Sequence, residues 1–134
     1  MLDTLLSLIN FLFNLFNKLP SETKEEIIKT ITDAFREIFK KKNHSTKDMK
    51  EAAESVMDEQ WEVTSTLAVS SFLPSNFSKS QKEKFSLSLI ELVRSDKFLN
   101  ELDKRLEKHK NLSEEDYINK STLEMHNLIK EMLK

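Results

Sequence analysis

The stretch LLSLINFLFNLFNKLP, residues 5–20, is the most apolar part of the chain and can be read in three ways. A secretion signal needs a basic start and a small-residue cleavage site, whereas the first charge here is Asp3 and Asn-Lys-Leu-Pro ends the apolar run. A membrane-spanning helix needs about 20 apolar residues, and residues 2–16 would extend only about 22 Å as a helix. We therefore expect an amphipathic helix that is neither a signal nor a membrane span.

A helical projection of this stretch gives one narrow polar strip and a broad apolar face. The strip, about 80° wide at about 100° per residue, contains Asp3, Ser7, Asn10, Asn14 and Asn17. The broad face must be covered by other helices of the chain, by a partner or second copy, or by a membrane surface. Membrane-surface helices usually carry Lys or Arg beside the apolar face, and the strip has none before Lys18, so the membrane is the least favoured. The candidate partner-binding residues are Leu5, Ile9, Phe11, Leu12, Phe13 and Phe16.

The composition of the chain predicts an all-α fold. Its 134 residues suit one domain with a real core. There is no glycine and only two prolines, and tight hairpin turns rely heavily on glycine. We expect a compact bundle of five or six helices in a single domain, residues 1–134. Its first helix, within residues 1–19, is strongly apolar and packs on residues 21–134 or extends from them.

Capping patterns predict where the helices begin and end. Thr23 and Glu26 form a capping-box pattern for a second helix, which ends at Lys40–Asn43 and whose apolar face of Ile31, Phe35 and Phe39 the first helix should cover. Three further helices are expected, at residues 45–73, 80–94 and from Ser95 or Asp96 to about 110. Ser113 should cap the last helix.

Two segments of the sequence, each at an expected corner between two helices, resemble each other. Residues 40–48 read KKKNHSTKD and residues 108–116 read KHKNLSEED. An internal duplication of a helical hairpin would explain the match, but the flanking helices agree only in spacing. We favour two helix–Asn–helix corners that use the same capping chemistry.

Residues suited to catalysis or metal binding are scarce. Without glycine there is no phosphate-binding loop or nucleophile elbow, and without cysteine there is no thiolate zinc site. His44, His109 and His126 lack zinc-ligand spacing. Trp61 is interpreted as a core anchor, and the acidic series Glu51, Glu54, Asp58 and Glu62 as a solvated helix face. We expect no catalytic residue, no metal and no cofactor.

Lysines gather at the two similar corners and raise the possibility of nucleic-acid contact. Basic patches can bind phosphates without reading sequence, but no aromatic residues alternate with these lysines as stacking surfaces would require. The net charge is also only −2. The candidate nucleic-acid contacts are Lys40, Lys41, Lys42, Lys47, Lys104, Arg105, Lys108 and Lys110.

The function expected from these patterns is protein–protein interaction without catalysis. Large apolar helix faces favour an adaptor, an inhibitor or a small subunit of an assembly, with a protein partner or self-association. The absence of cysteine fits an intracellular, cytoplasmic location. The first alternative is a helical subunit lining a nucleic acid, and the second is a peripheral membrane protein docked by its first helix. The bias toward Lys, Asn, Ser, Ile and Phe is typical of an accessory protein of an AT-rich bacterial or phage genome.

Overall fold

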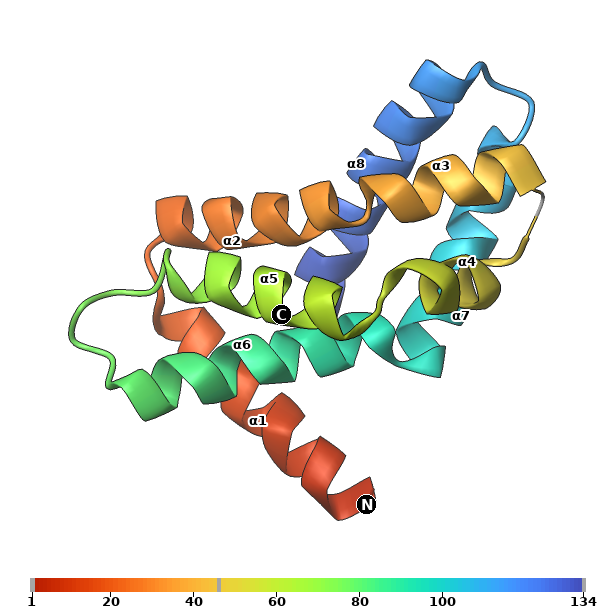
Figure 1. The fold of residues 1–134 in the computed structure, drawn as a ribbon. Coiled ribbons are helices and arrows are strands. Elements are labelled where there is room, and N and C mark those ends of the chain that lie inside the picture. The colour runs from red at the N-terminus through yellow and green to blue at the C-terminus, as the bar shows by residue number, and fades with distance from the viewer. Residues whose placement is uncertain (1, 46, 134) are drawn as a thin grey trace.

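The computed structural model describes residues 2–45 and 47–133, and only the backbone for residues 2–9. The described residues contain helices and no strand, which confirms the all-α class (Figure 1). The helices are α1 (Leu2–Lys18), α2 (Ser21–Ala34), α3 (Arg36–Ser45), α4 (Met49–Val56), α5 (Glu59–Ser70), α6 (Lys79–Arg94), α7 (Asp96–Leu106), the short 3-10 helix η1 (Glu107–His109) and α8 (Glu114–Met132).

The predicted count of five or six helices is too low because two expected helices are each divided. The second expected helix is interrupted at Phe35, between α2 and α3, and the third at Met57 and Asp58, between α4 and α5. At the second break Met57 leaves the helical region, with φ −78° and ψ 66°, and the Asp58 side chain accepts a hydrogen bond from the backbone N–H of Trp61. Asp58 therefore starts a new helix instead of lying on a continuous acidic face.

The break before α5 also changes which of its residues face the core. A continuous helix over residues 45–73 would place Leu67 and Phe72 on the same inward face as Trp61, yet Leu67 is 67% exposed and Phe72, just after α5, is exposed as well. Ser65 and Val69 are buried in their place. The prediction was wrong because it assumed one continuous helix. The chain leaves the helical conformation at residues 57 and 58, so the residues after the break no longer continue the apolar face of the residues before it.

The core is organised around Phe35, at the junction of α2 and α3. Its ring centroid lies 6.0 Å from those of Phe39 and Trp61 and 6.4 Å from that of Phe98 on α7. The indole Nε1–H of Trp61 donates to the Ala34 carbonyl at 3.0 Å. Trp61 is partly buried against this core, as the sequence predicts, and its hydrogen bond satisfies the last turn of α2.

The first helix packs mainly against α6, and α6 in turn packs against α5. The expectation that it covers Ile31, Phe35 and Phe39 was therefore wrong, because Trp61 and α7 lie beside that aromatic cluster. Hydrogen bonds between Ser70 and Ser86 and between Glu62 and Arg94 show that α5 and α6 run antiparallel. Figure 1 shows α5 and α1 both next to α6.

Some of the predicted helix N-caps are observed and others are not. Ser113 caps α8 as expected, and α7 is capped by Ser95, one of the two residues expected there. Thr23 does not cap α2, which begins earlier, at Ser21 after Pro20. Ser45 lies in the last turn of α3, where its hydroxyl donates to the Lys41 carbonyl, and Asp48 caps α4 instead.

A capping box that the sequence analysis missed begins α6. The Ser78 hydroxyl accepts from the backbone N–H of Gln81, and the Gln81 side chain accepts from the backbone N–H of Ser78. Two donors at the start of α6 are thus satisfied reciprocally. This fixes the helix on which α1 rests.

Candidate protein-interaction surface

The C-terminal half of α1 belongs to the core. Leu12 is fully buried and Phe16 is 5% exposed, while Leu19, just after the helix, is also buried. Asn10 and Asn14 on the polar strip are exposed, as predicted for water-facing positions. Among the candidate partner-binding residues, Leu12 and Phe16 are therefore already used within the chain.

The remaining described aromatic residues of α1 are only partly buried. Phe11 and Phe13 pack against the core without being enclosed by it. The Lys84 ammonium of α6 lies 4.4 Å from the centroid of the Phe11 ring, and the Lys24 ammonium lies 5.6 Å from that of Phe16. Such cation–π contacts shield one face of a ring and add modest stability. They attach α1 to both α6 and α2.

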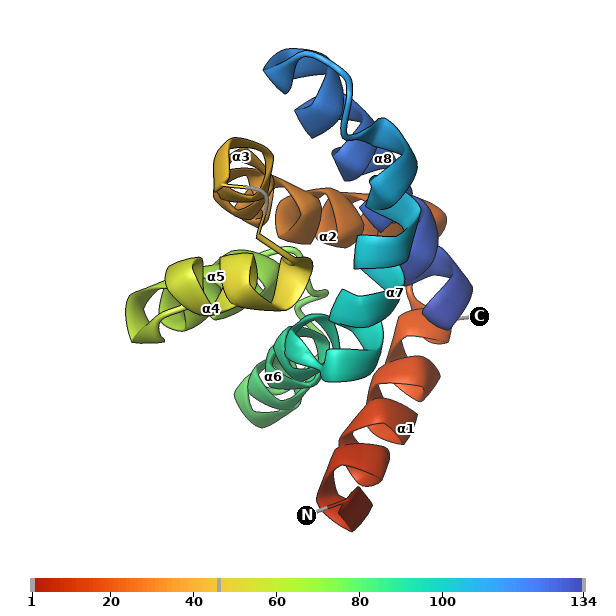
Figure 2. The same cartoon turned by 90° about the vertical axis from the view of Figure 1, so that its right-hand side faces the viewer.

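The N-terminal end of α1 projects away from the other helices, as Figures 1 and 2 show from two directions. Its backbone is helical from Leu2 onward. The sequence of residues 2–9, LDTLLSLI, contains Asp3 as its only charge. Leu5 and Ile9 belong to this part, and their side chains lie outside the described residues.

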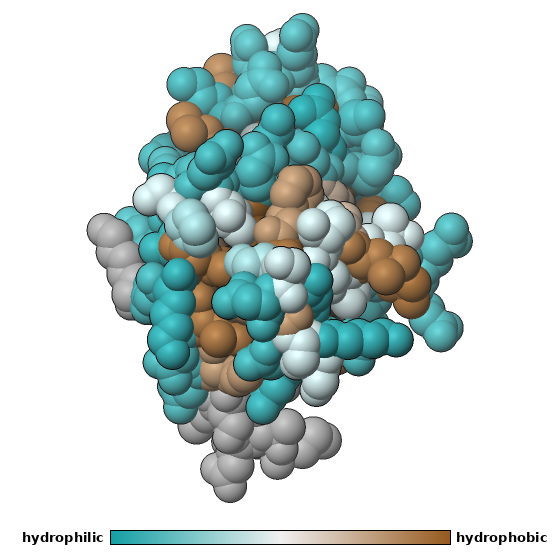
Figure 3. Space-filling model, turned by 90° about the vertical axis from the view of Figure 1, so that its left-hand side faces the viewer, coloured by the Kyte–Doolittle hydropathy of each residue, from teal (hydrophilic) through white to brown (hydrophobic). Residues whose placement is uncertain are grey.

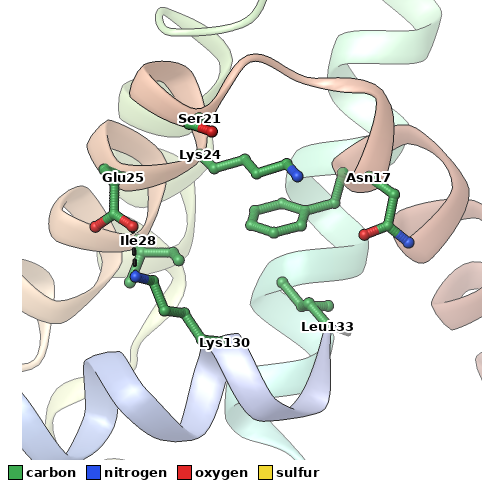
Figure 4. A pocket seen from close by; sticks show the side chains of 8 residues that line it. Asn17, Ser21, Lys24, Glu25, Ile28, Lys130 and Leu133 are labelled. Carbon is green, nitrogen blue, oxygen red and sulfur yellow. Dashed lines mark ion pairs between the residues drawn. The ribbon is translucent and has the colours of Figure 1, made fainter.

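A shallow cleft of about 260 Å³ lies where α1, α2 and α8 meet (Figure 4). The carboxylate of Glu25 accepts from Lys130 at 2.6 Å and lies 3.1 Å from Nε2 of His126. The hydrogen bond from Lys130 holds the pKa of Glu25 below its usual value; partial desolvation opposes this and the His126 charge adds to it. These contacts join the C-terminal part of α8 to α2.

The basic candidates are mostly engaged in ion pairs. Lys42 is buried, and its ammonium lies 2.8 Å from Oδ1 of Asp103 on α7. Lys40, Arg105, Lys108 and Lys110 pair with glutamates. Lys41, Lys47 and Lys104 are exposed and have no ion pair among the described residues.

The two similar corners of the sequence lie together at one end of the bundle, near the C-terminal end of α3 (Figure 1). Besides the pair between Lys42 and Asp103, His44 of the first corner contacts Glu114 of the second at 3.1 Å. The prediction that Asn43 ends a helix was wrong, because α3 continues to Ser45. The resulting surface mixes charges of both signs.

The buried pair of Lys42 and Asp103 is a feature that the sequence analysis missed. The same Oδ1 of Asp103 accepts from the backbone N–H of Met49 at 3.1 Å, which joins α7 to the start of α4. Tyr117 on α8 is buried, and this burial raises its pKa to about 12, with the carboxylates of Asp103 and Glu107 acting in the same direction. No spacing rule in the sequence links residues 42, 103 and 117.

The other two histidines also contact glutamate carboxylates. His109 lies 3.5 Å from the Glu124 carboxylate and His126 contacts Glu25. In the part of the chain that the structure describes, no three His, Asp or Glu side chains gather as metal ligands. Likewise, none of the described helices is both long and apolar enough for a membrane crossing. The expected absence of a metal, a cofactor and a catalytic residue stays a prediction.

Comparisons with known proteins identify no relative of this chain. No protein-family model matches the chain, and neither a curated protein nor a solved structure is significantly similar to it.

Proposed function

We propose that the chain is a non-enzymatic protein-interaction module that binds a protein partner or a second copy through the N-terminal half of α1. The observation that carries this proposal is the division of the helix. Leu12 and Phe16 anchor its C-terminal half, while the backbone continues as a helix away from the other helices (Figure 2). An adaptor, an inhibitor and a small subunit of an assembly would all use such a helix.

The apolar sequence of residues 2–9 gives the projecting half its binding energy. Covering a leucine or isoleucine side chain that is otherwise in water contributes about 1.5–3 kcal/mol. Leu5 and Ile9 are spaced four residues apart, so they share one side of a helix. An apolar stripe of this kind is how an amphipathic helix enters a groove of a partner.

Replacing two apolar residues of the projecting half with aspartate tests this proposal directly. The variant Leu5→Asp with Ile9→Asp is expected to unfold at the same temperature as the unchanged chain and to lose association. Association is measured by sedimentation velocity for self-association and by co-purification from the native host for a partner. The variant Asn10→Asp with Asn14→Asp adds the same charge on the exposed strip and is expected to retain binding.

Three outcomes would count against this function. Undiminished association of the Leu5→Asp, Ile9→Asp variant would exclude α1 as the binding element. A large fall in its unfolding temperature would show that residues 5 and 9 belong to the core. Flotation of the unchanged chain with liposomes, lost in the variant, would favour a membrane surface in place of a protein.

The location in the cell and the nucleic-acid alternative are secondary to the proposed role of α1. The cytoplasmic location inferred from the lack of cysteine stays part of the proposal. The start of α8 contributes exposed acidic residues to the end of the bundle at which the two similar corners lie, where Glu114 contacts His44 and Glu115 follows it in the sequence. A mixed-charge surface offers less phosphate affinity than a basic one.

A further inference from the structure

A second apolar surface lies between α5 and α6, separate from the projecting half of α1. Val63 and Leu67 on α5 are 54% and 67% exposed, and Leu87 on α6 is 41% exposed. They line one groove of about 410 Å³, called here the α5–α6 groove. Single exposed apolar residues are common on protein surfaces, whereas these three lie together around one groove. Contiguous exposed apolar residues are a feature of interaction sites.

Small residues take part in the contact between the two helices. Ser65 and Ser86 are buried, and the hydroxyls of Ser70 and Ser86 lie 2.7 Å apart. Small side chains let two helices approach closely, so the larger Val63 and Leu87 remain on the outer flanks. Figure 3 views the adjoining end of the bundle, where α5 leads to α6, and shows further apolar side chains between hydrophilic ones.

Carboxylates stand at both ends of the groove. Glu59 lies one turn before Val63 on α5, and Glu83 lies one turn before Leu87 on α6. Since the helices are antiparallel, these two glutamates are at opposite ends. Both are exposed and neither has an ion pair among the described residues, whereas Glu62 is paired with Arg94 at 2.9 Å.

We infer that the α5–α6 groove binds a basic amphipathic helix of a partner protein. Apolar residues of that helix, spaced three or four apart, would contact Val63, Leu67 and Leu87, and Lys or Arg residues on either side would pair with Glu59 and Glu83. A helix fits because the groove lies between two antiparallel helices, into which the side-chain ridges of a third can pack. An extended strand would find no sheet edge in the described part of the chain.

Charge distinguishes this occupant from the other candidates. The apolar helix α1 of a second copy carries only Asp3 as a charge before Lys18, so it gives Glu59 and Glu83 nothing to pair with. An anionic membrane would find no basic residue in the lining of the groove, as far as the structure describes it, and two unpaired carboxylates there. A basic helix gains from both the apolar floor and the acidic ends.

The test uses a synthetic peptide of about 15 residues, long enough for an isolated helix to begin to form. It has leucines along one helical face and lysines elsewhere. A second peptide has glutamates in place of the lysines, and a third has the same Leu/Lys composition with the leucines dispersed. We expect the first peptide to bind at least about tenfold more tightly than the other two, and to shift the NMR signals of α5 and α6.

Variants of the protein locate the binding site. Leu67→Ser with Leu87→Ser should weaken the first peptide about tenfold or more, and Glu59→Gln with Glu83→Gln should weaken it and reduce its salt dependence. Leu123→Ser, at an exposed leucine of α8, is the matched control and should bind normally. Leu5→Asp with Ile9→Asp should also bind normally, so a failure of the α1 proposal would not affect this result.

Several results would overturn the inference. They are no binding of the Leu/Lys peptide, binding that survives the Leu67→Ser, Leu87→Ser variant, and NMR shifts that map to α1 or α8. Dimerisation of the unchanged chain that the same variant abolishes would assign the groove to a second copy. Binding to phosphatidylcholine vesicles lost in that variant would assign it to a membrane.

Discussion

Replacing Asp103 with alanine is expected to lower the free energy of unfolding by about 3 kcal/mol, because the buried Lys42 ammonium would lose its partner. Lys42 is 3% exposed and has its Nζ 2.8 Å from Asp103. This loss is at the low end for a broken buried ion pair, because the Asp103 side chain is 31% exposed to solvent. The backbone N–H of Met49 would also lose its acceptor. Urea unfolding measures the change.

A double replacement separates the charge effect from packing. Lys42→Met with Asp103→Leu removes both charges and fills similar volume, so it should recover the part of the lost stability that comes from the unpaired Lys42 charge. The Met49 N–H still lacks its acceptor in this variant. Lys50 forms an exposed pair with Asp96, and Lys50→Ala is the control, with a loss of under about 1 kcal/mol. If Asp103→Ala is as mild as this control, or if the double variant is no more stable than Asp103→Ala, the buried pair does not join α3 to α7 as described.

Phe35→Ala is expected to cost about 3–5 kcal/mol of folding stability. The Phe35 side chain is fully buried and contacts the rings of Phe39, Trp61 and Phe98 from three other helices. Its loss would leave a cavity at the junction of α2 and α3 and remove favourable edge-to-face ring contacts. A domain is typically stable by only about 5–15 kcal/mol, so the variant should unfold at a clearly lower temperature or urea concentration.

The exposed Phe72 supplies the matched control for Phe35. Phe72→Ala removes the same ring from the surface and is expected to change stability by only about 0.5 kcal/mol. Trp61 fluorescence should respond to Phe35→Ala, because the two rings are 6.0 Å apart. Equal losses for the two alanine variants would mean that the core is not centred on Phe35.

The fold class could be predicted because it depends on features that the sequence carries locally. The absence of glycine, the serine caps at Ser95 and Ser113 and the polar strip of α1 each act within a few residues. Asn10 and Asn14 face water for the reason given by the helical projection. Local rules of this kind need no knowledge of which helix lies beside which.

The errors come from choices that depend on tertiary packing. Whether residues 49–72 form one helix or two is decided at Met57 and Asp58, where a cap competes with helix continuation. Thr23 could have started α2, but Pro20 places the start earlier. The outward position of Leu67 follows from the break and could not be found from periodicity across it.

The candidate site was predicted only in part, for the same physical reason. The apolar character of α1 is visible in the sequence, but its division between core and projecting half depends on where α6 lies. Lys42 was expected on a basic surface. It is buried instead and pairs with Asp103, which is 61 residues away along the chain. Long-range pairs of this kind leave no spacing signal.

Thermal unfolding of two shortened chains tests the division of α1 most directly. Removing residues 1–9 is expected to leave the unfolding midpoint within a few degrees of the full chain, since Leu12, Phe16 and Leu19 still hold the rest of the helix against the core. Removing residues 1–19 deletes these three buried side chains, each contributing about 1.5–3 kcal/mol, and should abolish cooperative unfolding or lower its midpoint strongly. A loss on removing residues 1–9 as large as that on removing residues 1–19 would contradict the account, because the projecting half would then be core.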